Sequence, residues 1–165
     1  DVAMVQLLLY HSANVNSAAL DGRTPLIAAA MRGRLQVVEI LLPRGANLDD
    51  AEEHGATALA MAAQNLDVRM LQLLLDNGAA VDAPMQNGCT PLYLASRSGN
   101  TGVVSLLLQR KAAVNAPATD GTTSLIVASM AGHVGAVEAL LRGGANKDLS
   151  SQFGTAAEAA AHNVQ

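Results

Sequence analysis

Asp21-Gly22-Arg23-Thr24-Pro25-Leu26 is a stretch whose pattern returns three more times along the chain, each time displaced by 33 residues. The later copies read His54-Gly-Ala-Thr-Ala-Leu59, Asn87-Gly-Cys-Thr-Pro-Leu92 and Asp120-Gly-Thr-Thr-Ser-Leu125, and a fifth glycine follows at Gly154. A fixed period of this length is the signature of a stacked array in which each repeat is one supersecondary unit. The sequence therefore predicts a repeat protein in which each unit contacts only its neighbours.

Each copy predicts a short first helix after a tight turn. A threonine suited to the N-cap position precedes the helix, as Thr24, Thr57, Thr90 and Thr123. Pro25 and Pro91 follow at the first helical position, where a missing N–H is tolerated. The helix is expected to end near a glycine that accepts a left-handed conformation, at Gly33, Gly99 and Gly132. The second copy has Leu66 there, a departure that predicts either a strained or a re-routed helix end.

A second helix follows in each copy and is rich in leucine and valine. It is predicted over 35–41, 68–74, 101–107 and 134–140, where nearly continuous apolar residues indicate burial between neighbouring units. A second turn glycine comes next at Gly45, Gly78 and Gly144, but Ser12 and Lys111 replace it in two copies. Each replacement is expected to cost on the order of 1 kcal/mol if the backbone stays left-handed.

These copies resemble the ankyrin repeat, whose pattern is D-x-x-G-x-T-P-L-H-x-A-A, then G-H, a V-x-x-L-L run and G-A-x-V-N. The resemblance covers nearly the whole chain and implies an all-α solenoid of stacked helix-turn-helix units with β-hairpin-like turn tips. We expect one domain over 1–165, with full repeats at 19–51, 52–84, 85–117 and 118–150 and partial repeats at 1–18 and 151–165. In the last copy Glu158 occupies the position of the recurring leucine, so its register or its burial should depart from the pattern.

The amino-acid composition limits which residues can form the core and which classes of function are expected. Half of the residues are hydrophobic, yet the chain has only two tyrosines, one phenylalanine and no tryptophan, so the core must be aliphatic. The net charge of −4 comes without a basic block, which argues against nucleic-acid binding. No apolar run reaches the roughly 18 residues of a membrane span. A single cysteine excludes an intrachain disulfide and favours a reducing, intracellular compartment.

The resemblance also implies a binding surface for another protein. In the ankyrin fold the turn tips and the exposed side of the first helices form a concave face that commonly grips proteins. Carried over position by position, this concave face comprises Leu20, Asp21, Arg23, Met31, Arg32, Glu53, His54, Gln64, Asn65, Gln86, Asn87, Cys89, Arg97, Ser98, Thr119, Asp120, Thr122 and Met130. Arg32, Arg97, Met31 and Leu20 are the expected anchors, because arginine and exposed apolar groups are enriched in interfaces. Ordinary solvated surface is the alternative interpretation of every one of these positions.

The amino-terminal segment is a second candidate contact surface. Val2, Met4, Val5 and Leu8 lie on a predicted amphipathic helix that would normally pack on a preceding helix. If left open, these side chains would form the kind of apolar patch that marks an interface. Continuation of the same polypeptide or docking on a neighbouring subunit would cover them.

The sequence gives no support for catalysis, a cofactor or a metal site. Glu52, Glu53 and His54 combine two carboxylates with an imidazole, but they fall on a predicted turn tip and are expected to be solvated. The other histidines are scattered and lack ligand spacing, at His11, His133 and His162. Cys89 follows a turn glycine and is expected to be an exposed, small and tolerated turn residue, with an oxidation sensor as the alternative.

Three hypotheses about function remain open at this point. The first is a non-enzymatic module whose concave face binds another protein. The second is a structural subunit of a larger complex that contacts its neighbours through its ends or its convex face. The third is a regulatory ankyrin region of a longer enzyme or channel.

Overall fold

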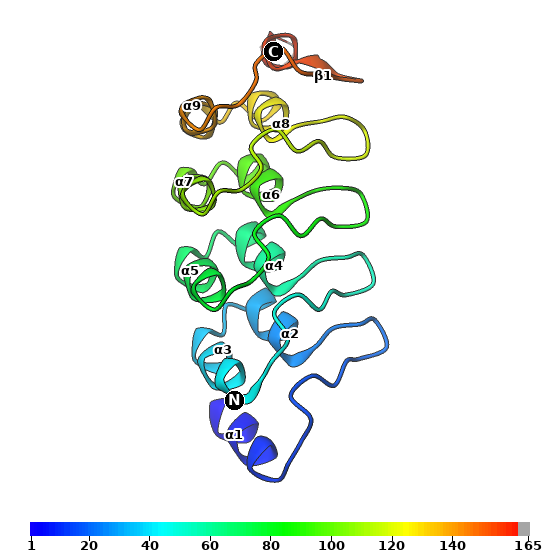
Figure 1. Cartoon of the computed structure of the whole chain (residues 1–165), viewed down its shortest axis with the longest axis vertical. Helices are drawn as coiled ribbons and strands as arrows, with labels where there is room; N and C mark the ends of the chain where they lie inside the picture. The colour runs from blue at the N-terminus through cyan, green and yellow to red at the C-terminus, as the bar shows by residue number, and fades with distance from the viewer. Residues whose placement is uncertain (162–165) are drawn as a thin grey trace. The chain divides into compact units, whose positions relative to one another are not determined.

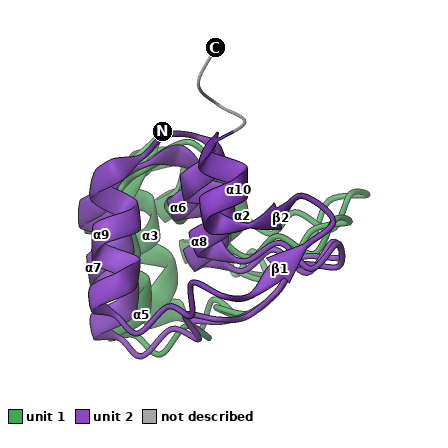
Figure 2. Ribbon diagram, turned by 90° about the horizontal axis from the view of Figure 1, so that it is seen from above, with its two compact units in different colours: residues 1–80 green, residues 81–165 purple. Residues whose placement is uncertain are grey.

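The computed structural model describes residues 1–161 and divides into two compact units, 1–80 and 81–165 (Figure 2). His162, one of the scattered histidines, lies outside the described residues. The elements follow one another along the chain as helix pairs (Figure 1). The first unit contains α1 Val2–Tyr10, α2 Pro25–Met31, α3 Leu35–Leu41, the 3-10 helix η1 Leu42–Arg44, α4 Ala58–Gln64 and α5 Val68–Asp76. The second contains α6 Pro91–Ser98, α7 Thr101–Gln109, α8 Ser124–Met130, α9 Val134–Arg142, β1 Ser150–Ser151, β2 Gly154–Thr155 and α10 Ala156–Ala161.

Within each unit the helices pack as the repeat pattern predicts. In the first unit α2 packs on α4, α4 on α5 and α1 on α3. In the second unit α6 packs on α8, α8 on α10 and α7 on α9. First helices therefore lie against first helices and second helices against second helices, and the predicted all-α fold is confirmed.

The predicted threonine caps are present in all four full copies. The Oγ1 atoms of Thr24, Thr57, Thr90 and Thr123 accept hydrogen bonds of 3.2–3.4 Å from the backbone N–H three residues later. Each cap satisfies a helix N–H that has no partner within the helix. The recurring threonine thus fixes where each first helix begins.

The core is aliphatic, as the composition predicts. The recurring leucine of the turn motif is at most 2% exposed at Leu26, Leu59, Leu92 and Leu125. Small residues of the first helices are also fully buried, including Ala30, Ala62, Ala63 and Ala95. Alanine allows the helices to approach closely, which compensates for the scarcity of aromatic side chains.

Among residues 1–161, three residues other than glycine adopt the left-handed backbone conformation. Ser12, Leu66 and Lys111 have φ angles of 65°, 62° and 67°. These are the three positions where the sequence departs from a recurring turn glycine, so the chain keeps the turn geometry and accepts the strain. For Ser12 and Lys111 this is the condition under which we expected a cost of on the order of 1 kcal/mol.

An asparagine or aspartate ladder links successive repeats within each unit. In the first unit the Oδ1 atoms of Asn16 and Asp49 accept hydrogen bonds of 2.9 Å from the backbone N–H groups of Asn47 and Ala80. In the second unit Asp82 and Asn115 accept in the same way, at 2.9 and 2.8 Å, from Ala113 and Asn146. The four acceptors stand 33 residues apart, so this bond is part of the repeat although the turn pattern does not reveal it.

The last repeat begins its helix one residue early. A strict 33-residue shift from Ser124 would start α10 at residue 157, but the helix starts at Ala156. The reason is Thr155, whose Oγ1 accepts from the Glu158 N–H at 3.4 Å while Glu158 Oε2 accepts from the Thr155 N–H at 2.7 Å. This reciprocal pair is a capping box. It changes the register of the last copy, so Glu158 takes the third helical position instead of a buried leucine position.

Candidate functional site

The turn tips share one hydrogen-bonded design. At the first tip the Ala19 N–H donates to the Arg23 carbonyl at 2.9 Å, and corresponding bonds of 2.9–3.1 Å close the second, third and fourth tips. The last tip forms a two-stranded antiparallel pair, with Ser150 opposite Thr155. The β-hairpin-like tips that the resemblance implies are therefore present.

A side-chain acceptor stabilises each of three tips. Oδ1 atoms of Asp21, Asn87 and Asp120 accept from the backbone N–H two residues later at 2.9–3.1 Å. These backbone bonds, from Arg23 and Thr122, hold the pKa values of Asp21 and Asp120 below the ordinary range for a carboxyl group. Asp21 also forms an ion pair of 2.6 Å with Arg23, so both side chains are already engaged within the tip.

Two residues predicted for the concave face are buried. Cys89 is 4% exposed and Thr122 is 1% exposed. Both follow the turn glycine, and both side chains are buried instead of facing solvent. Their assignment to an accessible binding face, and the expected exposure of Cys89, are therefore wrong.

The second tip uses Glu52 where the first, third and fourth tips use aspartate or asparagine. His54 occupies the usual acceptor position, and Glu52 Oε1 instead accepts from the backbone N–H groups of His54 and Ala56, both at 3.0 Å. Glu52 is consequently only 9% exposed, which corrects the expectation that it is a solvated loop residue. The side chains of Glu53 and His54 are 58% and 71% exposed and stay on the surface as expected. Ligand atoms of these three residues lie within 4.8 Å of one another, but Glu52 already serves the turn.

The carboxyl ends of the first helices present variable side chains. Met31, Gln64, Arg97 and Met130 stand at one repeat position, and each is exposed or half-buried. Asn65 is also exposed, and its Nδ2 donates to the Met31 carbonyl at 2.8 Å, which fixes two neighbouring helix ends to each other. The remaining predicted residues of the concave face are half-buried at Ser98 and exposed at Leu20, Arg32, Gln86, Asn87, Thr119 and Asp120.

Tyr93 joins this surface although the sequence prediction omitted it. It is half-buried on α6, at the position where the ankyrin pattern has histidine, beside Cys89. Burial raises the pKa of both the Tyr93 hydroxyl and the Cys89 thiol, and Arg97 and Asp120 are close enough to influence both groups. The signal that would have found it is the scarcity of aromatic residues, since the chain has only two tyrosines.

The predicted end face is partly open. Helix α1 contains no buried residue; Met4 and Leu8 are 54% and 52% exposed, whereas Val2 and Val5 are half-buried. A hollow of about 370 Å³ lies beside α1 and is lined by Asp1, Val5, Pro25, Ala28, Ala29, Arg32, Arg34 and Val37.

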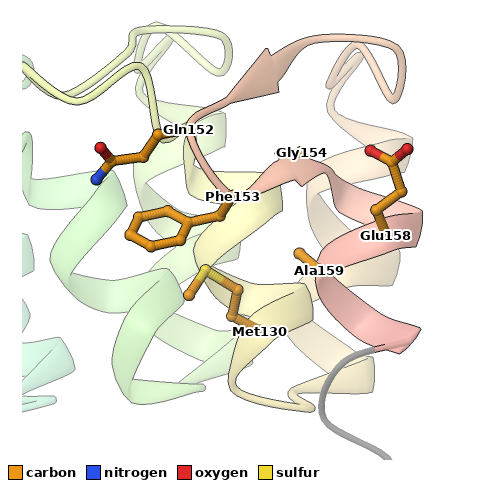
Figure 3. A pocket seen from close by; sticks show the side chains of 6 residues that line it. All are labelled: Met130, Gln152, Phe153, Gly154, Glu158 and Ala159. Carbon is orange, nitrogen blue, oxygen red and sulfur yellow. The ribbon is translucent and has the colours of Figure 1, made fainter.

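A larger open groove lies at the last tip, within the second unit. Its volume is about 580 Å³, and its lining comes from the end of α8, the β1–β2 turn and α10. Figure 3 shows the six lining residues, with the Phe153 ring beside Met130 and the Glu158 carboxylate at the other end, next to Gly154. Phe153 is 45% exposed. Only Met130 among these residues belonged to the predicted concave face.

Comparison with known proteins agrees with the geometry. A model of the family described as ankyrin repeats, in three copies, matches residues 1–85 and again residues 70–151. The chain belongs to the ankyrin-repeat family. Ankyrin repeats are generally protein–protein interaction modules, and the family is typically non-enzymatic. No curated protein matched this ankyrin chain. Among its described residues, every helix is too short or too polar to span a bilayer.

Proposed function

We propose that this ankyrin array is a non-enzymatic module that binds another protein through its concave face. One observation carries the proposal: the repeat position at the end of each first helix changes from Met31 to Gln64, Arg97 and Met130, while its side chain stays accessible in every copy. The leucine five residues earlier is invariant and buried at all four positions. A constant buried position and a variable accessible position in every repeat are the pattern expected of a recognition surface.

Affinity capture from native lysate tests this proposal. The 165-residue chain is compared with a variant that carries Arg32→Glu, Gln64→Ala and Arg97→Glu, and captured proteins are identified by mass spectrometry. A matched control carries Arg44→Glu, Arg69→Glu and Gln72→Ala, which make the same chemical changes at exposed positions of η1 and α5. Circular dichroism verifies that all three proteins keep their helical signal.

The expected result is a protein captured by the unaltered chain and by the control, and lost with the concave-face variant. Equal capture by all three proteins would refute binding through the concave face. Loss of the captured protein with the control variant alone would indicate that the partner binds the second helices instead.

A second candidate rests on the exposure of α1. Met4 and Leu8 expose more than half of their surface, which favours contact of this helix with a neighbouring protein in an assembly. Met4→Asp with Leu8→Asp should then abolish the assembly and leave the capture described above unchanged. Assembly that survives both changes would exclude this candidate.

A further inference from the structure

Two asparagines of the chain are followed directly by glycine, in the pairs Asn77-Gly78 and Asn87-Gly88. In such a pair the glycine nitrogen can attack the side-chain amide carbon of the asparagine, because glycine has no Cβ to hinder a close approach. Hydroxide removes the proton of the glycine N–H, a bond forms between the nitrogen and Cγ, and the Cγ–Nδ2 bond breaks. Water protonates the departing nitrogen, which leaves as ammonia, and a second water opens the succinimide ring to aspartate or isoaspartate.

The third tip holds the side chain of Asn87 in a conformation that favours this attack. Asn87 is exposed, and its Oδ1 accepts a hydrogen bond of 3.1 Å from the Cys89 N–H. A bond to the N–H two residues ahead curves the side chain along the backbone that follows, which brings Cγ toward the Gly88 nitrogen. A backbone N–H only donates, so the oxygen faces Cys89. The same N–H would stabilise the negative charge that develops on Oδ1 during the attack.

Asn77 has the same neighbour but the opposite conformation. It is the exposed C-cap of α5, and its Nδ2 donates to the Leu73 carbonyl at 2.8 Å. Because Leu73 lies four residues earlier, the side chain is folded back over the last turn of α5 and away from Gly78. The two glycine nitrogens are alike, since each donates to the carbonyl three residues earlier, at 2.9 Å for Gly88 and 3.1 Å for Gly78. The difference between the two pairs therefore lies in the asparagine side chains.

We propose that Asn87 is a site of spontaneous deamidation, at which a carboxylate replaces the side-chain amide, and that the fold protects Asn77 from the same reaction. The reaction adds one negative charge to the third tip. Its occurrence does not depend on the proposed function, although Asn87 belongs to the predicted concave face.

The two products differ in how they fit the tip. Aspartate fits, because Asp21 and Asp120 occupy the equivalent position of the first and fourth tips and accept the same backbone bond through Oδ1. Isoaspartate instead carries the main chain through Cγ. It would displace the residue 87 carbonyl, which accepts from the Thr119 N–H at 2.9 Å and from the Thr119 hydroxyl at 3.0 Å. The isoaspartate product should therefore loosen the contact between the third and fourth tips.

Peptide mapping after prolonged incubation at pH 8 tests the proposal on the 165-residue chain. Trypsin releases both pairs in one peptide, residues 70–97, because no lysine or arginine lies between Arg69 and Arg97. Fragment-ion mass spectrometry then assigns the conversion of amide to acid to each asparagine separately. We expect Asn87 to react about tenfold faster than Asn77, as one hydrogen bond to a developing negative charge would produce.

Two comparisons show whether the fold causes the difference. In the urea-unfolded chain both asparagines lose their hydrogen bonds, so their rates should become similar. Asp120→Asn places the same pair of residues in the fourth tip, where the Thr122 N–H donates to the side chain at 2.9 Å. Position 120 of this variant should react about as fast as Asn87 when circular dichroism shows the helical signal unchanged.

The proposal is overturned if Asn87 of the folded chain reacts no faster than Asn77. It is also overturned if the difference persists in urea, because the neighbouring sequence would then cause it. A folded Asp120→Asn variant that reacts as slowly as Asn77 would refute the role of the tip conformation.

Discussion

Replacing Lys111 by glycine is expected to stabilise the protein, although it removes a charged side chain and adds no contact. Lys111 has a φ angle of 67° and donates its N–H to the Leu108 carbonyl at 3.0 Å. In three other repeats the same position is Gly45, Gly78 or Gly144, with φ between 82° and 95°. The left-handed conformation costs an L-residue about 1–2 kcal/mol. Glycine loses about 0.4–1 kcal/mol more conformational entropy on folding, which leaves a net gain of about 0.8 kcal/mol at the middle of the two ranges.

The reciprocal substitution at the equivalent position provides the comparison. A Cβ at residue 144 would meet no atom within 4 Å, so Gly144→Lys introduces backbone strain without a clash. Its free energy of unfolding should fall by about the amount that Lys111→Gly gains. Lys111→Gln serves as a control for the charge and should leave stability unchanged.

Urea unfolding followed by far-UV circular dichroism measures all three effects. The reasoning predicts a higher midpoint for Lys111→Gly, a lower one for Gly144→Lys and the original one for Lys111→Gln. A midpoint of Lys111→Gly at or below that of the unaltered chain would refute it, because left-handed strain would then contribute nothing at this turn.

Three further results are expected. Gly88→Ala should destabilise the protein by about 2–3 kcal/mol, which is more than Gly144→Ala. The alanine would have to adopt a φ of 76°, and its Cβ would in addition lie 2.9 Å from the Thr119 backbone nitrogen. Equal losses of stability in urea unfolding would contradict this contact. Cys89 should react with iodoacetamide at pH 8 far more slowly in the folded chain than in the urea-unfolded chain, because the residue is 4% exposed and burial raises the pKa of its thiol. Mass spectrometry measures the two rates of alkylation, and equal rates would disprove the burial of Cys89. The Thr122 N–H lowers the pKa of Asp120, so ionised Asp120 stabilises the fold above the unfolded carboxyl pKa of about 3.9, and this stabilisation is lost as pH falls through the lower folded pKa. Asp120→Asn should therefore make the free energy of unfolding depend less on pH on the acid side. An unchanged pH dependence would exclude this linkage.

The sequence predicts the helices well because the signals are local. Thr24 and its three equivalents cap within three residues, and Pro25 begins a helix by its own ring geometry. Ser12, Leu66 and Lys111 were recognisable as strained because glycine occupies their places in other copies. Repetition gives each position several independent observations within one chain.

The sequence predictions failed at positions where the surroundings of a side chain, and not its place in the repeat, decide its exposure. Glu52 was assigned to solvent because its role in the turn exists only when His54 cannot serve as acceptor. Cys89 and Thr122 were assigned to the surface because turn residues are usually exposed, but both are buried. The groove at Phe153 was missed because it depends on the one-residue shift of α10, which the Thr155–Glu158 capping box produces.

The asparagine and aspartate ladder has a consequence for how such a chain changes length during evolution. Each 33-residue repeat carries both a side-chain acceptor, such as that of Asp82, and a backbone donor, such as that of Ala113, which the neighbouring repeats require. A tandem duplication of one repeat therefore supplies a matching acceptor and donor at both of its boundaries, and each joint, meaning this hydrogen bond between repeats, forms without any compensating mutation. Gain or loss of whole repeats is the change this architecture tolerates best, whereas an insertion of one or two residues between acceptor and donor would break the joint.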